Sequence, residues 1–140
     1  MKFKIFLLVL FVQFSFLQTS AQTPSPSLNV KQSKKLVFLD SETNTKPSVK
    51  FTSVFINDGS KRGSTTWLFT GREGKDWKYI SGDANSDDVE VLFLKVGNYS
   101  VELAVTYTYD VVLKSGETEI EEDEVAFELE SIVTAANNLD

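Results

Sequence analysis

The chain has 140 residues, a formal net charge of −6, and neither cysteine nor histidine. These totals exclude disulfide bonds, Ser-His-Asp and Cys-His catalysis, and metal sites built on histidine. The acidic balance also argues against a nucleic-acid partner, because phosphates need a basic face.

The first segment has the pattern of a secretory signal peptide, residues 1–21. Lys2 and Lys4 form a charged start, residues 5–12 are the densest apolar run, and small residues at 19–21 suit cleavage. The alternative is a retained membrane anchor, but polar residues interrupt the apolar run before it reaches the roughly 20 residues of a span. We therefore expect a mature chain that begins at Gln22, has no transmembrane segment, and lies in the periplasm, at the cell surface or outside the cell.

The mature chain reads as one all-β domain. Residues 22–30 are polar and contain Pro24 and Pro26, so we expect a flexible leader. Short runs of period 2, separated by turn residues, then predict about seven strands in an antiparallel sandwich or barrel over residues 31–134. Residues 135–140 read as a frayed tail. The clearest runs are 36–39, 49–56, 67–69, 77–79, 89–93, 97–110 and 125–133.

The longest run, 97–110, reads GNYSVELAVTYTYD. Alternate side chains of a strand point to opposite faces, so Tyr99 and the apolar residues at 101, 103 and 105 share one face, which we assign to the core. The alternation fails at 110–113, where we expect a bulge or a bend. Tyr107 and Tyr109 then lie near the domain end, where their hydroxyls can reach water.

Three segments resemble the polycystic kidney disease (PKD) domain, an immunoglobulin-like sandwich. VKFTS at 49–53 is similar to that family's V-x-F-x-x strand, and STTWLFTG at 64–71 resembles Y-x-W-x-F-G-D-G. FLKVGNYSVELAV at 93–105 resembles F-x-x-x-G-x-Y-x-V-x-L-x-V. The chain departs from the family at 70–72, where Thr-Gly-Arg replaces the Gly-Asp-Gly turn.

The resemblance implies an immunoglobulin-like antiparallel β-sandwich with Trp67 in its core. It also implies a domain that is usually non-catalytic, occurs in exported proteins, and contacts proteins or polysaccharides. The signal ending in Ser-Ala-Gln is similar to those of exported Bacteroidetes proteins.

Four aromatic residues are candidates for contact with a partner or a glycan. Trp77 and Tyr79 share one face of a short strand beside Lys75 and Lys78, and exposed rings there would stack on sugars or anchor a protein. The alternative is that both rings pack in the core. The other two candidates are Tyr107 and Tyr109.

Two acidic segments are candidates for calcium, because calcium binds six to eight oxygens. One is the loop at 83–90, with three aspartates, and the other is the run at 117–124, with six carboxylates. Neither follows the D-x-D-x-D-G pattern, so the alternative is a solvated loop and a solvated hairpin whose charges protect a sheet edge. We expect no catalytic residue, no metal site and no cofactor.

Charge is unevenly divided along the mature chain. Residues 22–82 carry ten basic and five acidic side chains, a net of +5, and residues 83–140 carry two basic and fifteen acidic ones, a net of −13. Such a field would steer a basic partner to the acidic half. The alternative is that strands from both halves interleave and mix the charges.

These observations predict an exported, non-catalytic sandwich that serves as a protein-interaction or accessory subunit of a cell-envelope or surface complex. Docking would use an exposed edge strand, for which residues 36–39 and 125–129 are the candidates. The alternative is a carbohydrate-binding module that uses Trp77 and Tyr79 to hold a polysaccharide.

Overall fold

The computed structural model describes residues 23–40 and 46–137, so the expected signal peptide lies outside the described residues. Within them the chain forms eight strands and no helix. No part of the described chain therefore offers a helix of the length and apolarity needed to cross a bilayer. The strands are β1 (Ser27–Gln32), β2 (Leu36–Phe38), β3 (Ser48–Ile56), β4 (Lys61–Phe69), β5 (Trp77–Ser81), β6 (Asp88–Phe93), β7 (Gly97–Val112) and β8 (Thr118–Ala136).

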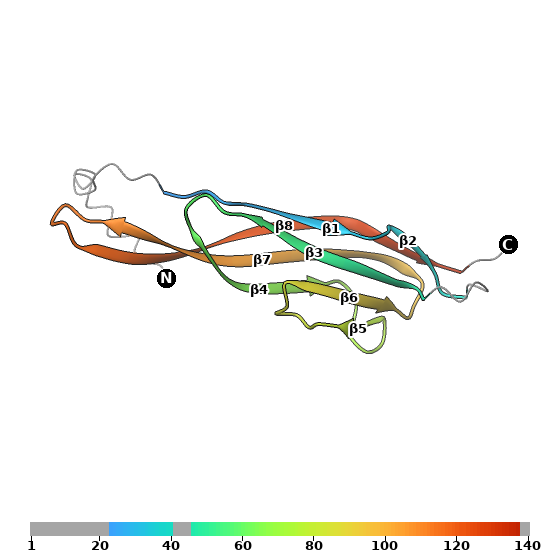
Figure 1. Cartoon of the computed structure of the whole chain (residues 1–140). Coiled ribbons are helices and arrows are strands. Elements are labelled where there is room, and N and C mark those ends of the chain that lie inside the picture. The colour runs from blue at the N-terminus through green and yellow to red at the C-terminus, as the bar shows by residue number, and fades with distance from the viewer. Residues whose placement is uncertain (1–22, 41–45, 138–140) are drawn as a thin grey trace.

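The strands form two sheets that pack face to face (Figure 1). One sheet has the order β1-β3-β6-β5 and the other has the order β2-β8-β7-β4. The pairs are antiparallel, except that short β2 lies parallel to the end of β8. This is the immunoglobulin arrangement, in which strands A, B, E and D face strands C, F and G. The expected immunoglobulin-like sandwich is confirmed, with eight strands where the sequence predicts about seven.

The core fills the space between the sheets with alternate residues of the long strands. Each side chain of this size contributes on the order of 1.5–3 kcal/mol when fully buried. The face of β7 assigned to the core is buried as expected. Its partner positions on β4 and β8 are apolar except for Thr65, which lies opposite Val105. The largest side chains with almost no exposure are Phe51, Phe93, Leu103, Val49, Val91, Val105 and Val133.

Tyr99 fixes the corner where the chain passes from β6 to β7. Its hydroxyl donates a hydrogen bond to the carbonyl oxygen of Lys95 at 2.7 Å. Its ring lies 4.8 Å from the ring of Phe93 between centroids. A tyrosine that closes this corner is a feature of immunoglobulin sandwiches. The G-x-Y part of the 93–105 pattern therefore has a structural role here.

Three expectations from the sequence need correction. The leader expected at 22–30 is shorter, because β1 begins at Ser27 and pairs with β3 while Leu28 enters the core. The tail expected at 135–140 starts later, because β8 reaches Ala136 and Ala135 is buried. No bulge occurs at 110–113, since the β7–β8 ladder is regular from 101 to 112 and its irregularity lies between Tyr99 and Val101. The alternation fades at 110–113 because the hairpin there has left the sandwich and neither face enters the core.

Candidate functional site

Trp77 belongs to the core. Its side chain is 5% exposed, and its ring lies 5.2 Å from the rings of Phe69 and Tyr79. The indole Nε1 donates to the carbonyl oxygen of Thr70 at 2.9 Å, so the polar atom is satisfied internally. The hypothesis that Trp77 is exposed and stacks on a sugar is therefore wrong, and the alternative that its ring packs in the core is correct.

Tyr79 lies at the border of the same cluster and is half-buried. Burial, together with the nearby carboxylates of Glu73 and Asp83, raises the pKa of its hydroxyl to about 12. A phenol with such a pKa stays neutral at physiological pH. With Trp77 buried, Tyr79 alone does not make an aromatic platform for a sugar.

Tyr107 and Tyr109 lie on β7, in the other sheet. Tyr107 is 6% exposed and its ring packs between Phe55, at 6.3 Å, and Tyr109, at 6.0 Å. Burial is the main cause that raises the pKa of both hydroxyls, and Asp123 adds to it. The expectation that both tyrosines reach toward solvent holds only for Tyr109, which is half-buried. The four aromatic candidates thus form two separate pairs, on β5 and β7.

A polar cluster that the sequence did not predict closes the sandwich beside Phe55. The Arg62 guanidinium donates to Ser53 Oγ at 2.7 Å and to Thr65 Oγ1 at 2.8 Å, and it forms an ion pair with Asp87 at 3.0 Å. It also lies 5.6 Å from the centre of the Phe55 ring. Arg62 lies on β4, and the one sequence signal for this cluster is the presence of polar residues, Ser53 and Thr65, at inward positions of β3 and β4.

The acidic loop at 83–87 lies along the open edge of β4 and hydrogen-bonds to it. The Ala84 carbonyl accepts from Trp67 N at 2.8 Å, and Asn85 Nδ2 donates to the carbonyl oxygen of Thr65 at 3.0 Å. Asp83 Oδ1 accepts from the backbone N of Asn85 at 2.8 Å. Across the residues that the structure describes, no group of three or more acidic side chains is placed to hold a metal ion.

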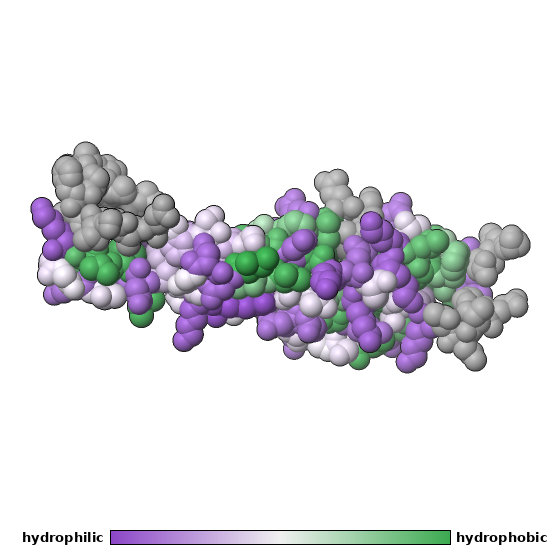
Figure 2. Space-filling model, turned by 45° about the horizontal axis from the view of Figure 1, so that its top comes forward, coloured by the Kyte–Doolittle hydropathy of each residue, from purple (hydrophilic) through white to green (hydrophobic). Residues whose placement is uncertain are grey.

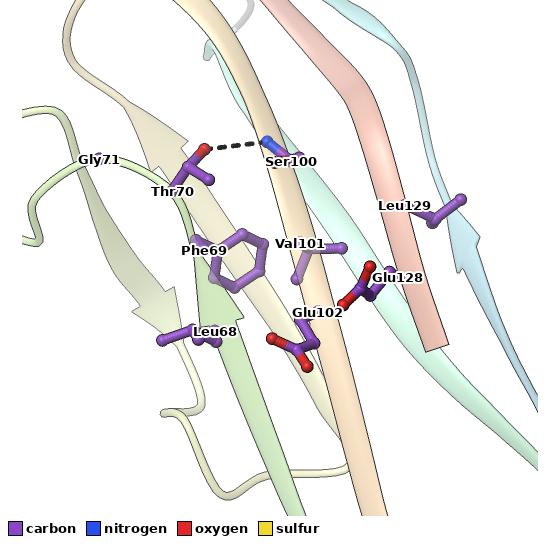
Figure 3. Close-up of a pocket in the computed structure, with 9 residues that line it drawn as sticks. All are labelled: Leu68, Phe69, Thr70, Gly71, Ser100, Val101, Glu102, Glu128 and Leu129. Carbon is purple, nitrogen blue, oxygen red and sulfur yellow. Dashed lines mark hydrogen bonds between the residues drawn. The ribbon is translucent and has the colours of Figure 1, made fainter. Parts of the chain in front are cut away.

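A shallow depression of about 410 Å³ lies on the outer face of the second sheet (Figure 3). Leu68, Glu102 and Glu128 occupy directly opposed positions on β4, β7 and β8. Thr70 Oγ1 accepts a hydrogen bond from Ser100 N at 3.0 Å at one end. Its lining residues offer two carboxylates but no base poised against a nucleophile, so the depression does not have the geometry of an acid-base catalytic site.

The most prominent feature is the distal hairpin, which we define as residues 109–124. The last pair between β4 and β7 is Lys61 with Thr108, so β7 and β8 continue beyond the sandwich as a two-stranded ribbon (Figure 1). This hairpin carries seven carboxylates and one lysine, a net charge of −6. Ile120 stands on it with 72% of its surface exposed.

The arrangement partly mixes the charges of the two halves of the chain. Lys50 lies opposite Glu90 on neighbouring strands, and Arg62 pairs with Asp87. The charges of the distal hairpin are not mixed in this way, because both its strands come from the acidic half of the chain. The uneven charge of the sequence therefore survives at this end.

β8 also presents an unpaired edge. Among the described residues, its strand pairing on the side away from β7 is with β2 at residues 134–136, and β1 lies near it without pairing. The surface in Figure 2 is mostly hydrophilic, with separate apolar patches in place of one continuous apolar face. The groups that this part of the molecule presents for contact are therefore the backbone N–H and C=O groups of the β8 edge and the carboxylates.

Comparison of the chain with protein-family models, with curated proteins and with solved structures finds no match. Function is therefore inferred from the geometry of the chain itself.

Proposed function

We propose that this chain is an exported, non-catalytic immunoglobulin-like module that binds another protein, as an accessory subunit of a cell-envelope or surface complex. The observation that carries the proposal is the distal hairpin, which projects from the sandwich with a net charge of −6 and continues into an open strand edge. A projecting charged ribbon adds little to the core of its own domain. It does provide a surface that steers and holds an oppositely charged partner.

Export is proposed from the charged, apolar and small-residue pattern of residues 1–21. The PKD-like segments at 49–53, 64–71 and 93–105 support the same proposal, because domains of that kind serve as contact modules in exported proteins. The burial of Trp77 weighs against the glycan-binding alternative.

The test is a pull-down with the tagged chain from Gln22 onward, from mildly solubilised envelopes of the source organism, followed by mass spectrometry. The matched control shortens the hairpin by replacing residues 110–120 with Asn-Gly, which closes a two-residue turn between the paired residues Tyr109 and Glu121. We expect a stoichiometric protein partner with the full chain and its loss with the shortened one. An empty pull-down from both, with the protein free in the periplasm or medium, would overturn the proposal.

A further inference from the structure

The direction of the backbone groups along β8 follows from hydrogen bonds on the far side of β7. Ser100 points toward β4, because its carbonyl accepts from Thr70 N at 3.1 Å and its N–H donates to Thr70 Oγ1. Backbone groups alternate sides along an antiparallel strand, so the odd-numbered residues of β7 point toward β8. Val105 faces Val125, and the odd-numbered residues of β8 therefore bond to β7.

The even-numbered residues of β8 consequently direct both N–H and C=O to the open side. This edge spans about 34 Å at roughly 3.4 Å per residue. It ends where the β7–β8 register shifts beyond Leu129. The residues with outward groups, all exposed, are Thr118, Ile120, Glu122, Glu124, Ala126 and Glu128.

The side chains that flank this edge change character halfway along it. On the face continuous with the core, Val125, Phe127 and Leu129 remain half-buried although they pack against the core cluster. On the same face, positions 119, 121 and 123 are all acidic. An added strand would thus meet apolar side chains in one half and carboxylates in the other.

Other edges of the two sheets are shorter or occupied. β2 has three residues and β5 has five. The open side of β4 already bonds to the loop at 83–87 through Trp67 N. β1 has six residues, and there the N–H of Val30 is bound by the Asn29 side chain at 2.8 Å. On β8 the N–H of Glu124 is bound in the same way by Asp123 Oδ1 at 2.8 Å. The edge of β8 is the longest of these with regular, outward-facing backbone groups.

We propose that residues 118–128 of β8 accept an extended strand of the partner protein by antiparallel pairing. In that strand, apolar residues face Val125, Phe127 and Leu129, and lysine or arginine faces positions 119, 121 and 123. The inference rests on the proposed function and specifies the partner's chemistry. A second copy of the chain is the poorer occupant. Paired antiparallel over 118–128, it would place Asp123 opposite itself and the acidic positions 119 and 121 opposite the apolar 127 and 125, so no carboxylate would gain a basic partner.

The probe is a synthetic peptide of about eleven residues, matched in length to the edge. It carries valine at the positions that would face 129, 127 and 125, lysine at those that would face 123, 121 and 119, and threonine between. Its control has glutamate in place of lysine. Fluorescence anisotropy of the labelled peptides should give a dissociation constant at least about tenfold lower for the lysine form.

Hydrogen exchange of the bound chain, read residue by residue by NMR, distinguishes strand addition from simple charge attraction. In the free protein the amides of Ile120, Glu122 and Ala126 should exchange fast, and those of Glu121 and Val125 slowly. The amide of Glu124 is left out of the comparison, because it donates to Asp123 Oδ1 at 2.8 Å. Binding of the peptide should protect the first set. Binding without that protection would overturn strand addition.

The matched variants are Ala126→Pro and Ala126→Thr. Proline removes one outward N–H and is tolerated on the open side of an edge strand, whereas threonine keeps the N–H. We expect Ala126→Pro to weaken peptide binding about tenfold and Ala126→Thr to leave it unchanged. If Ala126→Pro does not fold, Glu122→Pro takes its place, and equal binding by the folded proline variant and the wild type would overturn the inference.

Two outcomes separate this inference from the proposed function. A partner captured equally by wild type and Ala126→Pro would leave the function standing and overturn the edge. Protection of the even-numbered amides at high concentration of the protein alone, together with a dimer in sedimentation, would overturn the choice of partner in favour of a second copy.

Discussion

Tyr79 is the residue at which burial changes chemistry most. Its hydroxyl sits between the aromatic cluster of β4 and β5 and the carboxylates of Glu73 and Asp83, and the pKa is raised to about 12. The folded state therefore favours the neutral phenol. A raised folded pKa gives stability that is complete below the unfolded value near pH 10 and is lost as pH rises through about 12.

We expect the free energy of unfolding of the wild type to fall between about pH 10 and about pH 12, and to fall less in Tyr79→Phe. Urea unfolding at several pH values in this window measures the difference, and tyrosinate absorbance follows the titration. Some decline remains in the variant, because burial also raises the pKa of Tyr99, Tyr107 and Tyr109. Parallel curves for both proteins would contradict this assignment.

Among the elements, β4 contains a local irregularity that changes its register against β7. The β4–β7 register shifts between Arg62 and Thr65, and Gly63 lies inside the shift. A Cβ at Gly63 would lie 2.5 Å from Thr106 Oγ1 and 3.2 Å from the Thr106 carbonyl oxygen. The same hydroxyl accepts from Ser64 N at 2.8 Å. The glycine lets the two backbones approach closely enough for this contact.

Gly63→Ala should therefore lower the free energy of unfolding by about 1–3 kcal/mol, the usual cost of overpacking. In a Thr106→Ala background the closest contact is absent, so the same substitution should cost less. Chemical denaturation of the four proteins completes the cycle. Equal costs in both backgrounds would show that Thr106 is not the obstacle.

In both β7 and β8, the two halves of the strand have different roles. Their proximal halves carry apolar residues at alternate positions into the core, and their distal halves place tyrosines, threonines and carboxylates in a free ribbon. The sequence of β7 predicted the first half well, because alternation is a local signal. The length of the ribbon depends on where β4 ends, which no local pattern of β7 reports.

At the scale of the whole molecule, both tryptophans are interior probes. Trp67 is 2% exposed and Trp77 is 5% exposed, and their Nε1 atoms donate to the carbonyl oxygens of Ser86 and Thr70. We expect short-wavelength emission, weak quenching by acrylamide until the protein unfolds, and no change with a panel of soluble glycans. A saturable change with one glycan, in folded protein, would return the carbohydrate-binding alternative to consideration.

The sequence by itself determined the all-β class, the core face of 97–105 and the concentration of acids in the second half. These are local properties, set by the period of two and by composition. Tertiary structure decided that Trp77 and Tyr107 are buried and that Arg62 joins Ser53, Thr65 and Asp87. It also decided that, among the described residues, the second edge of β8 is paired at residues 134–136 alone. A strand with alternating apolar and polar residues has the same sequence pattern whether its second edge is paired or open, and whether or not a facing sheet covers it. Those outcomes depend on strands distant in sequence, and only their packing in space fixes them.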